Sequence, residues 1–313
     1  MTTVVRPMIE SDLPTARQIC HSAFGTFLGA PDPQNFWADR DYVYGRFGAE
    51  HVAGFTAELD DEVVGCNFAT RWGSVGFFGP LAVRPDLWDR GVAQPLVAAV
   101  SNAFEEWGVT HAGLATFPQS PKHIHLYGKF EFHPRFLTPL MVAPACAAAR
   151  GGWSRYSELP PSGRVAAEAE CREITDALYP GLDLAAEIRT VTARGLGDTL
   201  LLSDGSDRCA AFAVCHWGPQ SEAGEGSCFV KFGAVRPGPA ADQHFAALLD
   251  AGRALAASVG MPHLLAGVNL AREEAHRHMK ACGFRAEVNL VTLHRPNDPA
   301  YSRPGLYVLD DWR

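Results

Sequence analysis

The stretch Leu81-Ala82-Val83-Arg84-Pro85 returns later in the chain as Gly233-Ala234-Val235-Arg236-Pro237. From Arg84 to Arg236 the offset is 152 residues. The same offset, without a gap, pairs Leu96 with Leu248, Gly108 with Gly260, His111 with His263 and Phe132 with Phe284. Self-similarity in one register over such a span indicates an internal repeat. The sequence therefore predicts two copies of one structural unit.

The two copies differ in length just before this stretch. Upstream, Trp72-Gly73 matches Trp217-Gly218 at an offset of 145. The second copy therefore carries seven extra residues, the difference between the offsets 152 and 145. We place this insertion within 219–227.

Hydrophobic periodicity and turn residues predict the elements of the first copy. Strands are expected over 2–8, 52–58, 62–72, 75–83, 111–117 and 132–142. Helices are expected from a cap at 10–12 to 24, over 92–107 and over 121–129, and a long polar loop occupies 25–46. The strands from 52 to 83 should form an antiparallel meander, with Asp60-Asp61 at its hairpin turn.

The second copy begins after a connector over 143–164 that is rich in proline and small residues. Helices are expected over 165–178, 184–192, 240–258 and 272–281. Strands are expected over 198–202, 209–217, 229–235, 263–268 and 284–294. The predicted fold class is α/β (α+β), with two tandem domains of mixed, mostly antiparallel sheet flanked by helices. The predicted domains are 1–145 and 164–313, joined by a linker over 146–163.

Composition and net charge argue against several classes of protein and partner. The 313 residues are 47% hydrophobic and 20% charged, as in globular proteins. The formal net charge of −8 argues against nucleic acid or an anionic membrane as partner. No apolar run approaches the length that spans a bilayer, and the acidic start does not resemble a signal peptide, so a cytoplasmic location is expected. The eight cysteines lack zinc spacing and are expected to be reduced core thiols, with no metal bound.

A loop between a strand and a helix could hold a phosphate group in the first copy. The predicted strand ends at Val83, and the loop runs to Ala93 at the start of a helix. Unpaired backbone N–H groups and the helix dipole favour a pyrophosphate there. Gly91 adds no side chain that would block its approach, although it could equally be a permissive residue at a helix start.

This arrangement resembles the GCN5-related N-acetyltransferase (GNAT) family, whose acetyl-CoA loop reads V-x-P-x-[Q/R]-x-x-G-x-[G/A]. Val83, Pro85, Gly91 and Ala93 fit that pattern, whereas Trp88 replaces the usual Gln or Arg. The family's N-x-x-A-x-x-L-Y-x-K-x-G-F is similar to residues 120–132. Leu126, Tyr127, Lys129 and Phe132 match it, while Ser120, His123 and Glu131 depart. The resemblance spans about 2–142.

The resemblance implies a site for acetyl-CoA, or another short acyl-CoA, as co-substrate. The implied binding residues are Leu81, Ala82, Val83, Trp88, Asp89, Arg90, Gly91, Val92, Ala93 and Ser120. The thioester would lie in a gap between the strand at 81–83 and the strand at Ala115 and Thr116. Tyr127 would be the general acid that protonates the departing CoA thiolate, a role that suits a phenol. Tyr127 could instead be a packing residue between sheet and helix.

The general base is not evident, because 76–80, where many relatives place a Glu, contains no acid. Water could relay the proton instead. The candidate bases are His111, His123, His125, Asp39, Asp41 and Glu58. The aromatic, acidic loop 25–46 is expected to border the acceptor, or to be a packed surface loop.

The second copy lacks the residues that predict a CoA site in the first. At the offset of 152, Gly91 becomes Gln243, Ala93 becomes Phe245 and Tyr127 becomes Met279. We therefore expect no productive CoA binding there. The second copy would either wall the acceptor pocket or be purely structural, in a monomer with a pseudo-dimeric domain pair or in a homodimer.

The expected function is transfer of an acyl group, most simply acetyl, from CoA to an amine of a small molecule. Two alternatives stay open at this point. One is an acyl-CoA-binding sensor or scaffold without turnover, and the other is a peptide or protein N-acetyltransferase.

Overall fold

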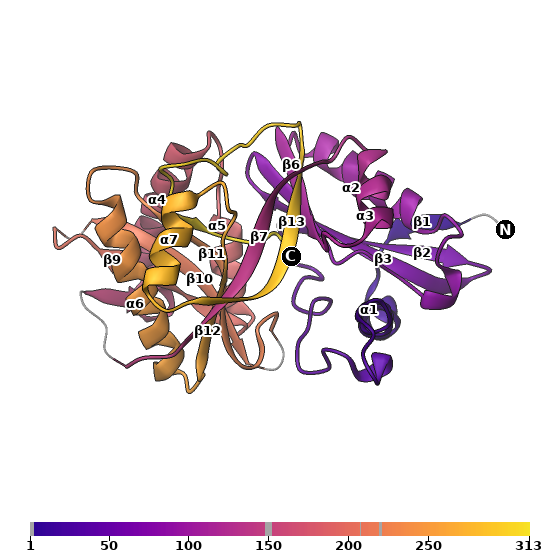
Figure 1. Cartoon of the computed structure of the whole chain (residues 1–313), viewed down its shortest axis with the longest axis horizontal. Coiled ribbons are helices and arrows are strands. Elements are labelled where there is room, and N and C mark those ends of the chain that lie inside the picture. Colours follow the sequence, from indigo (N-terminus) through magenta and orange to yellow (C-terminus); the bar gives the residue numbers. More distant parts are fainter. Residues whose placement is uncertain (1–2, 148–151, 207, 219–220) are drawn as a thin grey trace.

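The computed structural model describes residues 3–147, 152–206, 208–218 and 221–313. Two lobes lie side by side and share one continuous sheet (Figure 1). The strand order is β1-β2-β3-β4-β6-β13-β7-β12-β11-β10-β9-β8, with β5 paired to β3 and β14 to β11. Most neighbours are antiparallel, and β4–β6 and β11–β12 are the parallel pairs among them. The predicted fold class is confirmed.

The elements of the first copy follow the predicted order. They are β1 (Val4–Pro7), α1 (Leu13–Leu28), β2 (Val52–Leu59), β3 (Glu62–Trp72), β4 (Val75–Phe78), β5 (Ala82–Val83), α2 (Ala93–Glu106), β6 (His111–Thr116), α3 (Pro121–Gly128) and β7 (His133–Pro144). The predicted strand over 75–83 was wrong as one element. It is interrupted at Gly79-Pro80, where Gly79 has φ +143° and proline offers no N–H for pairing. The first helix runs past 24 to Leu28, and Gly29 after it is left-handed at φ 70°.

The second copy follows this order, with an additional helix, α5, and a final strand, β14. Its elements are β8 (Trp153–Arg155), α4 (Pro161–Leu178), α5 (Ala185–Ala193), β9 (Gly197–Ser203), β10 (Cys209–Gly218), β11 (Gly224–Val235), α6 (Ala241–Ser258), β12 (His263–Gly267), α7 (Glu273–Ala281), β13 (Arg285–Arg295) and β14 (Val308–Leu309). The connector over 143–164 is more structured than predicted, because it holds β8 and the first turn of α4. Residues 2, 148–151 and 219–220, which the predictions include, lie outside the described residues.

The two copies exchange their last strands. β13, from the second copy, lies between β6 and β7, while β7, from the first copy, pairs with β12 (Figure 1). The exchange extends to the cores. Leu293 of β13 packs with Phe104 and Phe132 of the first copy, and Met141 of β7 packs in the core of the second. Each core thus requires a strand from the other half of the chain.

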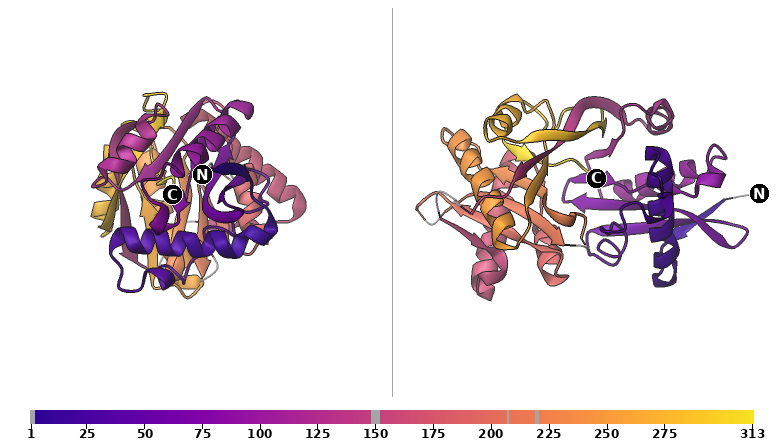
Figure 2. Two further views of the ribbon diagram at one scale, coloured as in Figure 1. Left: turned by 90° about the vertical axis from the view of Figure 1, so that its right-hand side faces the viewer. Right: turned by 60° about the horizontal axis from the view of Figure 1, so that its bottom comes forward.

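Helices cover both faces of the sheet in each lobe. α1 lies on one face of the first copy, and α2 and α3 lie on the other (Figure 2). α4 and α5 cover the face of the second copy that meets the first, where Trp72 and Phe77 pack against Phe232. We call this contact between the copies, formed by β3 and β4 against α5 and β11, the seam. Among the described residues, no helix is long and apolar enough to cross a membrane.

Candidate active site

In the first copy β4 and β6 stop pairing part-way along their length, and we call the region between 78–83 and 114–116 the slot. Their parallel pairing runs from Val75↔His111 to Phe77↔Gly113 and stops there. β6 continues alongside β13, and β5 continues alongside β3. The backbone from 78 to 83 therefore diverges from that of 114 to 116. The sequence predicts the thioester gap in this region, beside Ala115 and Thr116.

The predicted phosphate loop leads directly out of this slot. Gly91 has φ +83°, and a Cβ placed on it would meet no atom within 4 Å. α2 then begins at Ala93, and Val92 before it makes no side-chain cap bond. The helix start is therefore free of a capping side chain and has open space beside it, which suits a phosphate group.

Side chains of the loop fix it at two points. The Trp88 indole N–H donates to the Val83 carbonyl at 2.8 Å. Asp89, at φ 62°, accepts from Lys122 Nζ of α3 at 2.5 Å. Trp88 and Arg90 are exposed, and Leu81 is half-buried beside the buried Ala82 and Val83. Ser120 caps α3 by accepting from the His123 N–H at 3.4 Å.

Tyr127 contacts both walls of the slot. Its ring lies 5.7 Å from that of Phe78 on one wall, and Thr116 is on the other. Burial raises the pKa of this phenol, and the Thr116 side chain offsets that only partly. Tyr127 is therefore protonated at neutral pH and able to donate a proton.

The predicted bases are scattered. Asp41 bonds the N–H groups of residues 43 and 44, and Asp39 accepts from the Glu225 N–H. His111 bonds His294 at 3.0 Å, and burial lowers its pKa to about 4. Glu58 pairs with Arg6 on β1, and His125 is exposed on α3.

The His123 ring lies 6.3 Å from the Tyr127 ring, centroid to centroid. Its Nδ1 is 3.1 Å from the Thr116 hydroxyl, and its ring stacks on Phe27. Burial lowers the pKa of His123.

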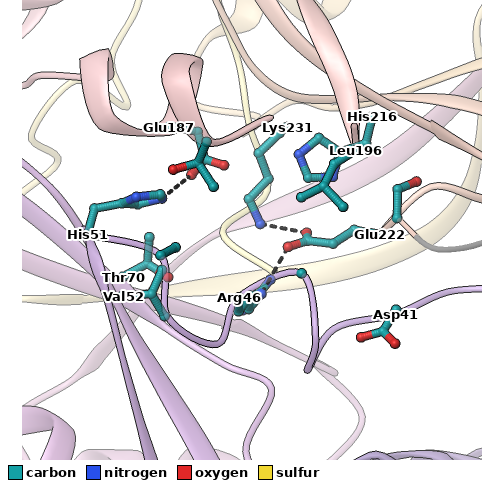
Figure 3. Close-up of a pocket in the computed structure, with 14 residues that line it drawn as sticks. Asp41, Arg46, His51, Val52, Thr70, Glu187, Leu196, His216, Glu222 and Lys231 are labelled. Atoms are coloured by element: carbon teal, nitrogen blue, oxygen red, sulfur yellow. Dashed lines mark hydrogen bonds and ion pairs between the residues drawn. The ribbon is translucent and has the colours of Figure 1, made fainter. Parts of the chain in front are cut away.

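Sequence reasoning missed a charged cluster on the opposite side of β4, in the seam (Figure 3). Arg46 donates to Glu222 at 2.9 Å, to the Gly79 carbonyl, and to the Arg313 backbone oxygen at 2.6 Å. Lys231 donates to Glu222 at 2.6 Å and to the same Arg313 oxygen at 3.0 Å. Burial is nearly complete for Arg46, Glu222 and Lys231. Two basic groups hold the pKa of the Glu222 carboxyl far below its usual range.

A cavity of about 20 Å³ adjoins the cluster, enough for about one water molecule. His216 lines it at 2% exposure, and neither ring nitrogen has a hydrogen-bond partner among the described residues. Burial lowers the pKa of His216 to about 4. On another wall Glu187 accepts from His51 at 3.0 Å and from Trp72 at 2.9 Å.

Two features of the sequence could have revealed this cluster. Lys231 stands alone in the apolar run 228–233, where a charge requires a buried partner. Glu222 lies within 219–227, where the seven-residue insertion is placed. The described part of that segment reaches across to the first copy.

The corresponding slot of the second copy is filled by its own chain. β11 and β12 pair only as far as Val230↔Ala266. Beyond that point β14 pairs with β11 at Gly233 and Ala234, the counterparts of Leu81 and Ala82. Phe245 and Met279 are fully buried in the core below.

The described residues include no group of three or more His, Cys, Asp or Glu side chains that could hold a metal ion. The eight cysteines are free thiols, and Cys20, Cys66, Cys171, Cys215 and Cys228 are buried.

Comparison with known proteins gives the class. Residues 17–132 match the model of the acetyltransferase (GNAT) family. No curated protein matches the chain in sequence. A candidate acetyltransferase from Pyrococcus horikoshii is similar in structure over 99% of this chain and 95% of that one, with TM-score 0.70 and 14% identity.

Two further solved structures resemble the whole chain. A GCN5-related N-acetyltransferase from Sphaerobacter thermophilus aligns over 94% of this chain and 95% of its own, with TM-score 0.59 and 13% identity. A tandem GNAT protein from the clavulanic acid biosynthesis pathway aligns over 95% and 100%, with TM-score 0.58 and 13% identity. The family match makes the first copy, over residues 17–132, an acetyltransferase domain of the GNAT family. The solved structures, one of them a tandem GNAT protein, show that the whole chain shares their fold.

Proposed function

We propose that the first copy transfers a short acyl group, most simply acetyl, from acyl-CoA to the amine of a small molecule. The observation that carries this proposal is the slot between β4 and β6 with Tyr127 against both of its walls. The phosphate loop supports it, since it follows β5 directly and leads into the start of α2.

The chemistry follows from these positions. The pantetheine arm would extend along the edge of 78–83 that faces away from β3, with the pyrophosphate at Gly91 and the start of α2. The amine nitrogen attacks the thioester carbonyl carbon, a C–N bond forms, and the C–S bond breaks. Tyr127 gives its proton to the departing sulfur. The pKa of Tyr127 is raised by burial, so the phenol is protonated at neutral pH.

The seam favours a small acceptor over a polypeptide. On the side of β4 opposite Tyr127, the loop after α1 is tied to the second copy, because the Asp41 N–H donates to the Ser221 carbonyl at 3.0 Å. The Arg46–Glu222 pair closes the same side. An extended peptide would have to displace these contacts. We propose that the second copy walls the acceptor pocket and that one chain is the active unit.

Turnover with acetyl-CoA and a panel of small amines tests this function, with free CoA thiol as the readout. Tyr127→Phe should lower kcat on the order of 10²- to 10⁴-fold while CoA affinity is retained, because only proton transfer is lost. Tyr156→Phe is the matched control, since Tyr156 is buried in the second copy and bonds Glu168. A wild type that binds CoA tightly and acylates no amine would favour the sensor, and turnover on peptides alone would favour the protein acetyltransferase.

A further inference from the structure

Lys231 is a buried amine from the second copy that borders the first copy's β4. Its side chain is 4% exposed, and its Nζ lies 5.3 Å from the centre of the Phe77 ring. At the repeat offset of 152, Lys231 is the counterpart of Gly79. The second copy thus places an amine beside the strand that forms one wall of the first copy's slot.

Hydrogen bonds connect this amine to the mouth of the slot. The Arg313 backbone oxygen accepts from both Lys231 Nζ and Arg46 Nη2, and Arg46 Nη1 donates to the Gly79 carbonyl. Gly79 lies where β4 ends and the strands diverge. An ammonium group has three N–H donors, and Lys231 donates two of them, to Glu222 and to Arg313. The third N–H can donate to water or substrate.

The surrounding charges influence whether the Lys231 amine is protonated or neutral. The charged and titratable groups that face it are Arg46, Glu187, His216, Glu222, Asp311 and Arg313. Burial and Arg46 lower the pKa of Lys231, and Glu222 and Glu187 raise it by less, so the net shift is downward. A buried lysine of this kind is a recognised type of general base.

We propose that Lys231, from the second copy, is the general base that takes a proton from the attacking amine in the first copy's slot. The inference rests on the proposed function and supplies the group that 76–80 lacks. An acceptor ammonium loses two protons during acylation. One passes to Lys231 and then to solvent. The other replaces the proton that Tyr127 gives to the CoA sulfur.

Two neighbours fit this role less well. Glu222 is held as a carboxylate by both Arg46 and Lys231, and a carboxyl with so low a pKa is a weak base. His216 has no hydrogen bond among the described residues that connects it to Gly79. We therefore assign Glu222 the part of a positioning residue, which orients the Lys231 amine.

The test compares kcat/KM against pH for the wild type, Lys231→Arg and Glu222→Gln, using the best small amine. Lys231→Arg keeps the charge but cannot lose its proton near neutral pH, so the rate should fall on the order of 10²- to 10⁴-fold and the acid limb of the profile should disappear. Glu222→Gln removes a charge that raises the pKa of Lys231, so the limb should move to lower pH. CoA affinity and melting temperature show whether each variant is folded.

A second readout does not depend on turnover. In protein with ¹³C-labelled lysine, the resonance that is missing from Lys231→Arg, or from Lys231→Met where the arginine variant does not fold, should titrate below the usual lysine value of about 10.4. Titration at or above that value would overturn the assignment, as would Lys231→Arg with an unchanged rate and pH profile. Failure of the wild type to acylate any amine would instead overturn the proposed function, and the role of Lys231 with it.

Discussion

The two slots of the molecule have one architecture and opposite contents. In the first, the parallel pairing of β4 with β6 stops at Phe77, and no strand of the described residues enters the gap beyond. In the second, β11 and β12 part at Val230, and β14 occupies the gap by pairing with Gly233 and Ala234. The separation of two parallel strands therefore does not by itself make a ligand site. A site also requires that no other segment of the chain fills the space between the separated strands.

The second copy also acts on the first. Its segment after β10 brings Glu222 to Arg46, and its β11 brings Lys231 to the Phe77 ring. A copy whose own slot is filled can thus, in our proposal, form a wall of its neighbour's site and supply a catalytic group to it.

The largest expected effect is a difference between the loop at Gly91 and its counterpart at Gln243. Gly91→Glu places a carboxylate in the open space where the pyrophosphate is expected, in a backbone conformation that strains any side chain. Repulsion between charges about 4 Å apart should raise KM for acyl-CoA on the order of 100-fold. Gln243→Glu, the exposed counterpart in the second copy, should leave KM unchanged. Equal effects of the two changes in steady-state kinetics would remove the distinction between the loops.

The exchanged strands should make the copies unfold together. Leu293 on β13 is fully buried in the first copy's core, so Leu293→Ala should lower the free energy of unfolding by about 2 to 5 kcal/mol. It should also lower the melting temperature of the acyl-CoA complex, although the substitution lies in the second copy's sequence. Val288→Ala on the same strand is the control, because Val288 is 41% exposed. Two separate transitions in urea, with the first-copy transition unmoved, would argue against this coupling.

The stability of the folded protein should decrease in acid because of His216, which lies in the seam. Burial lowers its folded pKa to about 4, whereas in the unfolded chain it is near 6.5. Between those values the unfolded chain binds a proton that the folded protein does not, so stability is full above pH 6.5 and falls as the pH drops toward 4. The loss is about 3 kcal/mol in order of magnitude. His216→Leu should make the dependence of unfolding free energy on pH less steep in this window, with the part due to the buried His111 and His294 remaining, and the exposed His263→Leu should not change it.

Residues close together in the sequence were predictable, and contacts between the copies were not. Periodicity and turn chemistry gave the order of helices and strands, and the repeat offset located the equivalents of Gly91 and Tyr127. The strand exchange could not be predicted, because β7 and β13 have similar apolar patterns. Such a pattern shows that a strand is buried but does not show in which copy's core it packs. Arg46 and Glu222 meet across 176 residues of chain. No local pattern links two such charges, and a two-residue strand such as β14 is too short to show a period.

The smallest expected effect concerns Trp88, where this chain departs from the family pattern and the second copy has Ala240 at the same offset. Trp88→Phe removes the indole N–H that bonds the Val83 carbonyl and keeps an aromatic ring. One neutral hydrogen bond contributes about 1 kcal/mol, so the free energy of unfolding should fall by about that amount. KM for acyl-CoA should change less than about threefold, since the backbone N–H groups that face the phosphate are unaltered. A tenfold rise in KM with unchanged stability would show that Trp88 itself contacts the ligand, and the contrast between the two loops would then depend on Trp88 and Ala240 as well as on Gly91 and Gln243.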